Sequence, residues 1–316
     1  MGALVSLGLI GFGQLSFDFT QAIKQHLAML DFPKFILGIL LSFLLFAGSL
    51  HIKFRELMSF GKSIFLFATL GTLLSTFLIG SGVYYLLTIF DITGSFISCL
   101  LFGALISPTD PIAVISILKS ANLSKSTEIR IFGESLFNDG IGVVIFATLF
   151  EVSTKGANQL NVPSVAFLFA KEALGGIAAG LAIGYLGYRM MKSIDQFQTE
   201  ILISLAMVMG GYTLCSILHV SGPLAMVIAG LFTGNKGKAE AMSNITRDYL
   251  EKFWEVTDHL LNAILFMLIG LEIVIVHFNS ASILIGLIAS FLLLLVRYIS
   301  LFIPSKVFLM SGNMEL

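Results

Sequence analysis

Three carboxylates lie in strongly apolar sequence between residues 105 and 145. Asp110 belongs to the run SPTDP at 107–111, and Glu134 and Asp139 belong to the run GESLFNDG at 133–140. A charged side chain at the centre of a bilayer costs roughly 2.5–3.5 kcal/mol on insertion scales. Carboxylates in such a setting therefore indicate chemistry, and oxygen-rich groups of this kind suit a hard cation that competes with a proton.

The first run predicts a broken helix. Pro108 and Pro111 flank Thr109 and Asp110, and a proline inside a helix removes an amide donor and clashes with the preceding turn. Broken helices at membrane depth line buried cavities, where transporters present backbone carbonyls to cations. Taken alone, the run is equally consistent with a simple kink in which Asp110 caps free amides and binds nothing.

The second run predicts a polar stripe on one helix. At 100° per residue, Ser135 and Asp139 share one face, and Glu134 and Asn138 share the adjoining face. Glycines in and after this run would let another helix approach closely; these are Gly133, Gly140 and Gly142. If this run served only as a contact between helices, two carboxylates would be buried in the membrane at a high cost in free energy. We therefore favour a functional site.

The two runs can meet within the membrane. They lie on successive apolar segments that cross in opposite directions, and Asp110 and Asp139 both fall well inside their segments. A desolvated aspartate has a raised pKa and can exchange a proton for a cation near neutral pH. We therefore expect one intramembrane site built from both segments.

Composition sets the class of protein. The 316 residues are 57% hydrophobic and 12% charged, and the mean hydropathy is +0.96. Soluble domains carry about 25% charged residues, so the chain is a polytopic membrane protein. A net charge of -1 argues against a nucleic-acid partner. We expect an all-α fold of ten segments, at about 2–17, 34–50, 62–90, 94–118, 131–152, 164–191, 200–218, 221–234, 254–277 and 281–310.

The basic residues predict the orientation of these segments. Loops rich in lysine and arginine alternate along the chain with loops that hold one or none. Thirteen basic residues then fall on one side of the membrane and three on the other. The positive-inside rule then places the N-terminus and the loop 235–253 in the cytoplasm. That loop is the longest polar stretch and is expected to be a solvated helix leading into segment 254–277. Within this segment, Asp258 is expected near the inner end, in contact with water, and Asn262 is expected to form a hydrogen bond to another helix.

The paired motifs SPTDPIAV and GESLFNDGIGVVIF resemble those of NhaP-type sodium/proton antiporters, the bacterial relatives of the eukaryotic sodium/hydrogen exchangers. Later runs agree with this resemblance, which spans nearly the whole chain: SGPLA at 221–225, AGL at 229–231, Phe253-Trp254 and LIGLE at 268–272. The resemblance implies an inverted-repeat fold with a discontinuous helix, multi-pass in the bacterial inner membrane.

The resemblance also implies roles for the charged runs. Asp139 would bind cation and proton alternately, and Thr109 and Ser135 would offer oxygen ligands to Na⁺. Asp110 would help to hold the site at the unwound helix. Asn138 matches the asparagine that precedes the exchanging aspartate in electroneutral relatives, so the resemblance implies exchange of one cation for one proton.

A structural ion pair is expected beside this site. The resemblance implies that Glu134 pairs with a buried arginine from a later helix, and Arg297 fits that role. Independent physics agrees, because Arg297 lies deep in segment 281–310 and needs a buried carboxylate partner.

The implied activity is exchange of Na⁺ or Li⁺ for H⁺ by alternating access, without an enzymatic reaction or a cofactor. Residues 1–58 and 164–277 would form a scaffold and homodimer contact, and residues 62–152 and 281–316 an ion-transport core. The partner of the SPTDP helix in the inverted repeat is expected beyond residue 316, so C-terminal spans are apparently missing. Two alternatives remain open: a truncated, non-transporting paralogue or remnant, and an intramembrane aspartyl hydrolase using Asp110 and Asp139.

Overall fold

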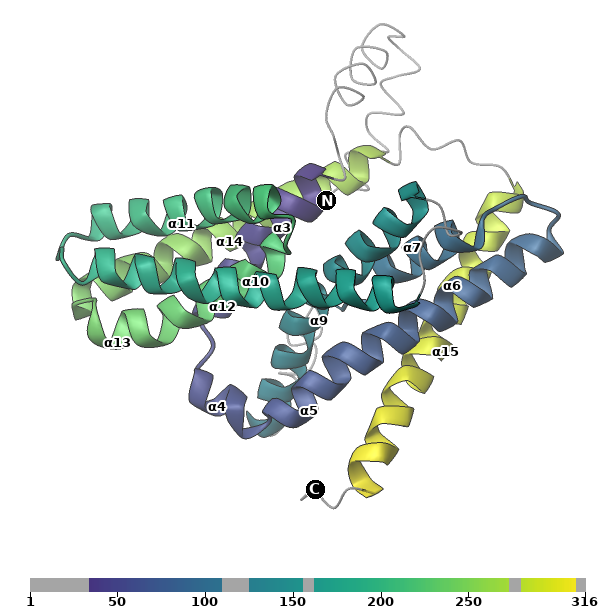
Figure 1. Cartoon of the computed structure of the whole chain (residues 1–316), viewed down its shortest axis with the longest axis horizontal. Coiled ribbons are helices and arrows are strands. Elements are labelled where there is room, and N and C mark those ends of the chain that lie inside the picture. The colour runs from purple at the N-terminus through teal and green to yellow at the C-terminus, as the bar shows by residue number, and fades with distance from the viewer. Residues whose placement is uncertain (1–33, 110–124, 156–161, 273–279, 311–316) are drawn as a thin grey trace, which may run out of the picture.

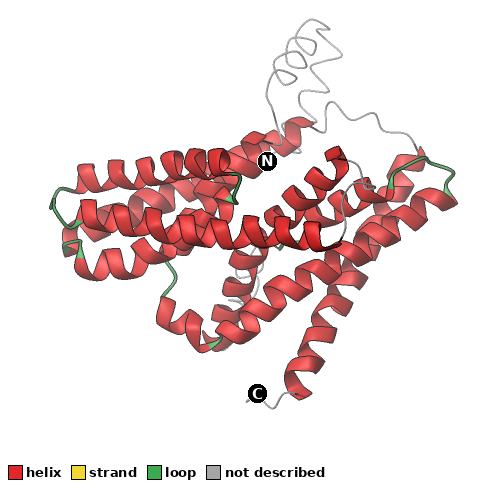
Figure 2. Cartoon of the chain, in the orientation of Figure 1, coloured by secondary structure: helices red, strands yellow, loops and turns green. Residues whose placement is uncertain are grey.

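The computed structural model of the chain describes residues 34–109, 125–155, 162–272 and 280–310, and every element within these ranges is a helix (Figures 1 and 2). In chain order the elements are η1 (Lys34–Leu40), α3 (Leu41–Leu50), α4 (Phe54–Ser59), α5 (Gly61–Leu66), η2 (Phe67–Gly71), α6 (Thr72–Ile89), α7 (Phe96–Ile106), α9 (Lys125–Lys155), α10 (Val162–Met191), α11 (Phe197–Leu218), α12 (Gly222–Phe232), η5 (Thr233–Gly237), α13 (Lys238–Glu240), α14 (Asn244–Glu272) and α15 (Ser280–Met310). The all-α prediction is confirmed for these residues.

Six stretches of the described chain are long and apolar enough to cross a membrane, namely 61–89, 125–154, 163–191, 197–218, 244–270 and 283–302. Two shorter apolar helices, Gly38–Leu50 and Phe96–Ile106, correspond to further predicted segments. The predicted segment 2–17 lies outside the described residues. The chain is therefore a multi-pass membrane protein.

The helices pack in two groups that α9 joins. Helices α6 and α7 form one close pair, and α15 packs along α6. In the other group α12 packs against α3, α10 and α11, while α14 lies along α3 and α11 (Figure 1). Helix α9 contacts α7 on one side and α10 and α12 on the other. The helix that carries Asp139 thus lies at the boundary between the groups.

Glycines allow the closest helix contacts in both groups. A Cβ at Gly103 of α7 would overlap the Thr76 carbonyl of α6, and one at Gly234 would overlap the Leu50 carbonyl at the end of α3. Small residues permit this approach where lipid supplies no hydrophobic drive for association. The buried cluster around Trp254 fills the second group, and the Trp254 indole donates to Ser204 Oγ at 3.0 Å.

Local sequence determines where several helices begin and end. Ser95 caps α7 by accepting a hydrogen bond from the Ser98 amide, and Ser221 caps α12 in the same way with Pro223 in its first turn. Helix α11 ends at His219, which adopts a left-handed conformation with φ of 52°. These caps fix the short connection between α11 and α12.

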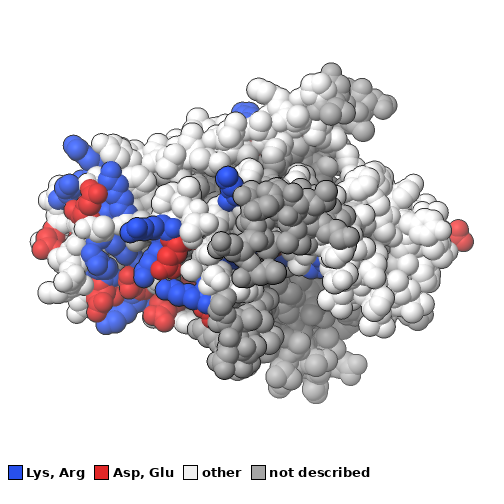
Figure 3. Space-filling model, turned by 90° about the horizontal axis from the view of Figure 1, so that it is seen from below, with Lys and Arg blue, Asp and Glu red and all other residues white. Residues whose placement is uncertain are grey.

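The polar stretch 235–253 is largely helical, as the sequence predicted. The α14 helix runs without interruption from Asn244 to Glu272, and η5 and α13 precede it. Figure 3 shows Lys, Arg, Asp and Glu side chains gathered at the end of the molecule where α13 lies. Lys238 and Glu251 form an ion pair there, with Nζ 2.6 Å from Oε1.

Candidate functional site

The predicted helix break coincides with the end of α7. The helix stops at Ile106, and the Ser107 hydroxyl donates to the Gly103 carbonyl at 2.6 Å. Pro108 packs against Gly142 of α9 so closely that a Cβ at Gly142 would overlap the proline ring. The predicted site residue Asp110 and the second proline, Pro111, lie outside the described residues.

Thr109 is the centre of a polar network between this break and α9. Its hydroxyl oxygen accepts hydrogen bonds from Asn138 Nδ2 and from Arg297 Nη2, both at 3.1 Å. The same oxygen lies 3.3 Å from Ser135 Oγ, and the Thr109 amide donates to Asn138 Oδ1 at 3.5 Å. Asn138 is fully buried, and Ser135 is buried.

Hydrogen-bond accounting determines the direction of the contact between the two hydroxyls. A hydroxyl has one donor and two acceptor sites, and both acceptor sites of Thr109 are used by Asn138 and Arg297. The Thr109 proton must therefore point to Ser135. In this conformation the Thr109 hydroxyl is fully used within the protein, so it could bind a cation only after Asn138 or Arg297 releases it.

Arg297 of α15 and Glu134 of α9 form an ion pair, with Nη2 2.7 Å from Oε1. The side chains are 25% and 16% exposed. Arg297 Nη1 is buried and has no hydrogen-bond partner within the described part of the chain. The Arg297 guanidinium thus contacts both the Glu134 carboxylate and the Thr109 hydroxyl.

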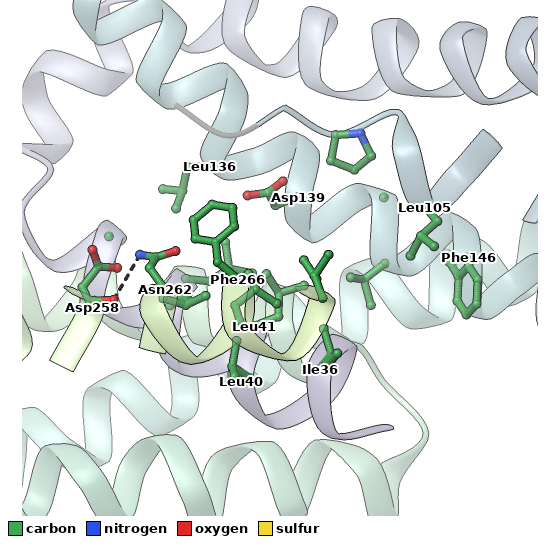
Figure 4. A pocket seen from close by; sticks show the side chains of 18 of the residues that line it. Ile36, Leu40, Leu41, Leu105, Leu136, Asp139, Phe146, Asp258, Asn262 and Phe266 are labelled. Atoms are coloured by element: carbon green, nitrogen blue, oxygen red, sulfur yellow. Dashed lines mark hydrogen bonds between the residues drawn. The ribbon is translucent and has the colours of Figure 1, made fainter. Parts of the chain in front are cut away.

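Asp139, one helical turn after Ser135, lines a cavity of about 430 Å³ between α3, α9 and α14 (Figure 4). It lies near the middle of α9 and is half-buried. The cavity wall on α9 follows one helical face: Phe132, Leu136, Asp139, Gly142, Val143 and Phe146. A carboxylate in this position can bind a proton or a cation that enters the cavity.

The opposite wall contains two polar residues whose location the sequence interpretation missed. Asp258 and Asn262 of α14 line the same cavity as Asp139. Asp258, expected to be solvated at the inner end of its helix, is half-buried, and Asn262 Nδ2 donates to the Asp258 carbonyl within α14 at 3.0 Å. The spacing of these residues with Leu265 and Ile269 was an available signal, since all four share one helical face.

The structure therefore brings five of the predicted site residues into one network: Thr109, Glu134, Ser135, Asn138 and Arg297. Asp139 lies on the adjoining face of α9 and lines the cavity. Within the described residues, no group of three or more His, Cys, Asp and Glu side chains is arranged to hold a metal. The available donors are carboxylate, hydroxyl and amide oxygens, which suit hard cations.

A helical multi-pass fold, with a carboxylate in a cavity between two helix groups, places the chain among membrane transporters. More specifically, the chain belongs to the sodium/hydrogen exchanger family, because the sequence model that describes the transmembrane region of this family matches residues 2–314.

Similar proteins support this assignment. The chain is 46% identical over 275 residues to the Na(+)/H(+) antiporter NhaP of Pseudomonas aeruginosa, covering 87% of this chain and 65% of that protein. It is 33% identical to the Na(+)/H(+) antiporter NhaH of Halobacillus aidingensis, covering 86% and 66%. The chain thus spans about two thirds of the length of these relatives.

The fold is also that of a solved member. The sodium proton antiporter MjNhaP1 of Methanocaldococcus jannaschii superimposes with a TM-score of 0.69 at 20% identity, covering 96% of this chain and 81% of that chain. This agreement concerns the fold alone, and it is consistent with the predicted antiporter architecture.

Proposed function

We propose that this protein exchanges Na⁺ or Li⁺ for H⁺ across a membrane, with Asp139 binding the cation and the proton in turn. The observation that carries the proposal is the position of Asp139, half-buried in a cavity wall at the middle of α9. A carboxylate removed from bulk water favours the protonated form unless a cation replaces the proton. The names of the similar proteins support Na⁺ as the cation.

The neighbours of Asp139 support a stoichiometry of one cation per proton. Glu134 is paired with Arg297, so its charge is already balanced. The Asn138 side chain is neutral, and both ends of its amide contact Thr109. One exchanging carboxylate then carries one positive charge in each direction, and transport is electroneutral.

Alternating access would come from movement of one helix group against the other. In this proposal residues 62–152 and 281–316 form the moving core, and residues 1–58 and 164–277 form the scaffold and a homodimer contact. The cavity supports this division, because α3 and α14 supply one wall and α9 the other. The protein would lie in a bacterial inner membrane, with its N-terminus and loop 235–253 in the cytoplasm.

Asp110 and the hydroxyls would complete the site. Ser135 and Thr109 are candidate oxygen ligands for Na⁺, but the Thr109 hydroxyl must first lose its contact with Arg297 or Asn138. Asp110 would help to hold the site from the unwound segment. Membership of a transporter family favours this function over the hydrolase alternative.

The test is cation-driven proton flux in proteoliposomes containing the purified protein. Addition of Na⁺ or Li⁺ should release protons from acid-loaded vesicles, and the Asp139→Asn variant should show no such release. Asp248→Asn is the matched control, because Asp248 is 71% exposed and pairs across the α14 surface with Lys252. Undiminished exchange by Asp139→Asn would overturn the mechanism.

A second arm tests the stoichiometry. A membrane potential imposed with potassium and valinomycin should leave the exchange rate unchanged, because no net charge moves. Exchange driven by that potential alone would contradict the electroneutral assignment.

A further inference from the structure

The cavity beside Asp139 is almost entirely apolar. Of the described part of the chain, twenty residues line it, and three of these have polar side chains: Asp139, Asp258 and Asn262. A cation that crosses such a cavity loses water and gains few oxygen ligands on its way to Asp139. The polar groups on the opposite wall therefore bear directly on how a cation reaches the site.

Asp258 and Asn262 lie at one end of the cavity wall. On α14 the wall begins with Asp258 and continues through Asn262 and Leu265 to Ile269, about 17 Å along the helix axis. Helices α9 and α14 begin on the side that the sequence predicts to be cytoplasmic. The carboxylate of Asp258 is thus at the cytoplasmic end of the wall, nearer to the charged surface around α13.

The orientation of Asn262 adds an oxygen ligand at this end. Its Nδ2 donates to the Asp258 carbonyl at 3.0 Å, which fixes the amide group. In Figure 4 the amide oxygen of Asn262 lies on the side of the cavity where Asp139 lies. A carboxylate followed by an amide oxygen, one helical turn apart, provides successive hard ligands for a partly hydrated alkali cation.

The charge of Asp258 should change the affinity of the protein for the cation and not the exchange of cation for proton at Asp139. A cleft with one sign of charge and low-dielectric walls raises the local concentration of counter-ions. Asp258 would attract cations to the cytoplasmic end, and Asp139 would still carry out the exchange. Loss of Asp258 should then weaken the apparent affinity for the cation and leave the maximal rate nearly unchanged.

We propose that Asp258, assisted by Asn262, is an entry station that binds the alkali cation on the cytoplasmic side before it reaches Asp139. This inference rests on the proposed exchange function and assigns Asp258 a positioning role. The station takes a monovalent cation with part of its hydration shell, and it sets the apparent KM for that cation at the cytoplasmic face.

Everted membrane vesicles test this proposal, because the added cation meets the cytoplasmic face. In Asp258→Asn the apparent KM for Na⁺ should rise about 10-fold at low ionic strength, the lower end of enrichment by a charged cleft. The maximal rate should stay within about twofold of wild type, and the KM difference should shrink at high salt because the charge is screened. Asp258→Glu should retain most of the affinity.

Asp248→Asn is the matched control, since it removes the same charge from an exposed position of the same helix. Its KM should equal that of wild type. If KM rose equally in Asp248→Asn and Asp258→Asn, the cause would be the general surface charge of the protein, and the proposal would be overturned.

Charge can also be restored after folding, which separates electrostatics from misfolding. The Asp258→Cys variant should have a raised KM, and a thiol reagent that adds a sulfonate should lower it again. A neutral reagent of similar size should not. The native Cys99 and Cys215 are buried, and treated wild-type protein checks that they do not contribute.

The outcomes distinguish this inference from the function on which it rests. Wild-type exchange that Asp139→Asn abolishes, with an unchanged KM in Asp258→Asn and no effect of the sulfonate, would overturn the entry station alone. Absence of cation-driven proton flux in wild-type vesicles would overturn both. The proposal would be supported by three results together: a raised KM in Asp258→Asn, a KM near that of wild type in Asp258→Glu, and a raised KM in Asp258→Cys that the sulfonate reagent lowers.

Discussion

The Arg297 side chain joins the ion pair to the helix break. It contacts Glu134 on α9 and the Thr109 hydroxyl that follows α7, so one guanidinium ties three segments together. Because both partners of the pair are largely removed from water, neither charge can be deleted alone without leaving the other uncompensated. Arg297 therefore stabilises the packing of α15, α9 and the segment after α7 against one another.

The first prediction concerns this pair. Arg297→Gln should lower the free energy of unfolding by about 3 kcal/mol, at the lower end of the range for a broken buried pair because Arg297 is 25% exposed. The Glu134→Gln, Arg297→Gln double variant should recover part of that loss, since no buried charge remains. Denaturant unfolding of the detergent-solubilised proteins measures both. Strictly additive losses in a double-mutant cycle would show that the pair is not coupled.

At the scale of the helices, Gly142 determines how closely the broken segment approaches α9. The Pro108 ring occupies the space beside Gly142, which a Cβ would fill. The same contact keeps Thr109 within hydrogen-bond distance of Ser135 and Asn138. A displacement of this segment would therefore disturb the whole polar network.

The second prediction follows from this contact. Gly142→Ala should destabilise the protein by about 1–3 kcal/mol, the usual cost of overpacking, and should reduce exchange strongly. Gly210→Ala is the matched control, because Gly210 lies within α11 and nothing is within 4 Å of an added Cβ. That control should be neutral or more stable, since alanine favours helix. Thermal unfolding and proton flux measure the two effects, and equal behaviour of the two variants would contradict the role of the contact.

Hydropathy and proline chemistry were sufficient to predict most of the helices. The apolar runs closely predicted the helical run 61–89, formed by α5, η2 and α6, as well as α10 and α11, and the two prolines predicted the end of α7 near Ile106. These features depend on local sequence alone. They needed no knowledge of which helices are neighbours.

The faces that helices present to each other were harder to predict. Spacing predicted a polar stripe on α9, but it did not show that Glu134 and Asp139 face different surroundings, the first towards Arg297 and the second towards the cavity. Asp258 was expected to be solvated because its distance from the helix start was the only guide. The packing of α14 along α3, which encloses the cavity, is a property of the tertiary structure.

At the scale of the whole molecule, the short connection after α3 leads from one helix group towards the other through α4 and α5. Asn235 holds this connection from both sides: its Oδ1 accepts from the Phe54 amide at 2.7 Å and its Nδ2 donates to the Ile52 carbonyl at 2.8 Å. Lys238 Nζ donates to the Leu50 carbonyl at 3.0 Å. These three hydrogen bonds anchor the connection to the η5–α13 region.

The final prediction concerns the pH response of this connection, where His51 follows α3. His51 is exposed at the surface, and partial loss of hydration, followed by the adjacent Lys238 ammonium, lowers the pKa of its imidazole below the ordinary value of 6.5 against the opposing charges of Glu251 and Glu255. Because protonation of this imidazole is less favourable in the folded state, the unfolded state binds more protons between the lowered pKa and 6.5. The His51 contribution to stability is therefore complete above pH 6.5 and is lost as the pH falls through that interval.

His51→Gln should make the midpoint of thermal unfolding less sensitive to acid below pH 6.5. Carboxylates elsewhere also titrate in acid, so the comparison is between the slopes of wild type and the variant and not between absolute midpoints. Identical slopes for wild type and His51→Gln would mean that the imidazole does not resist protonation at the end of α3. A reduced slope in His51→Gln would show that protonation of this imidazole weakens the fold at the end of α3.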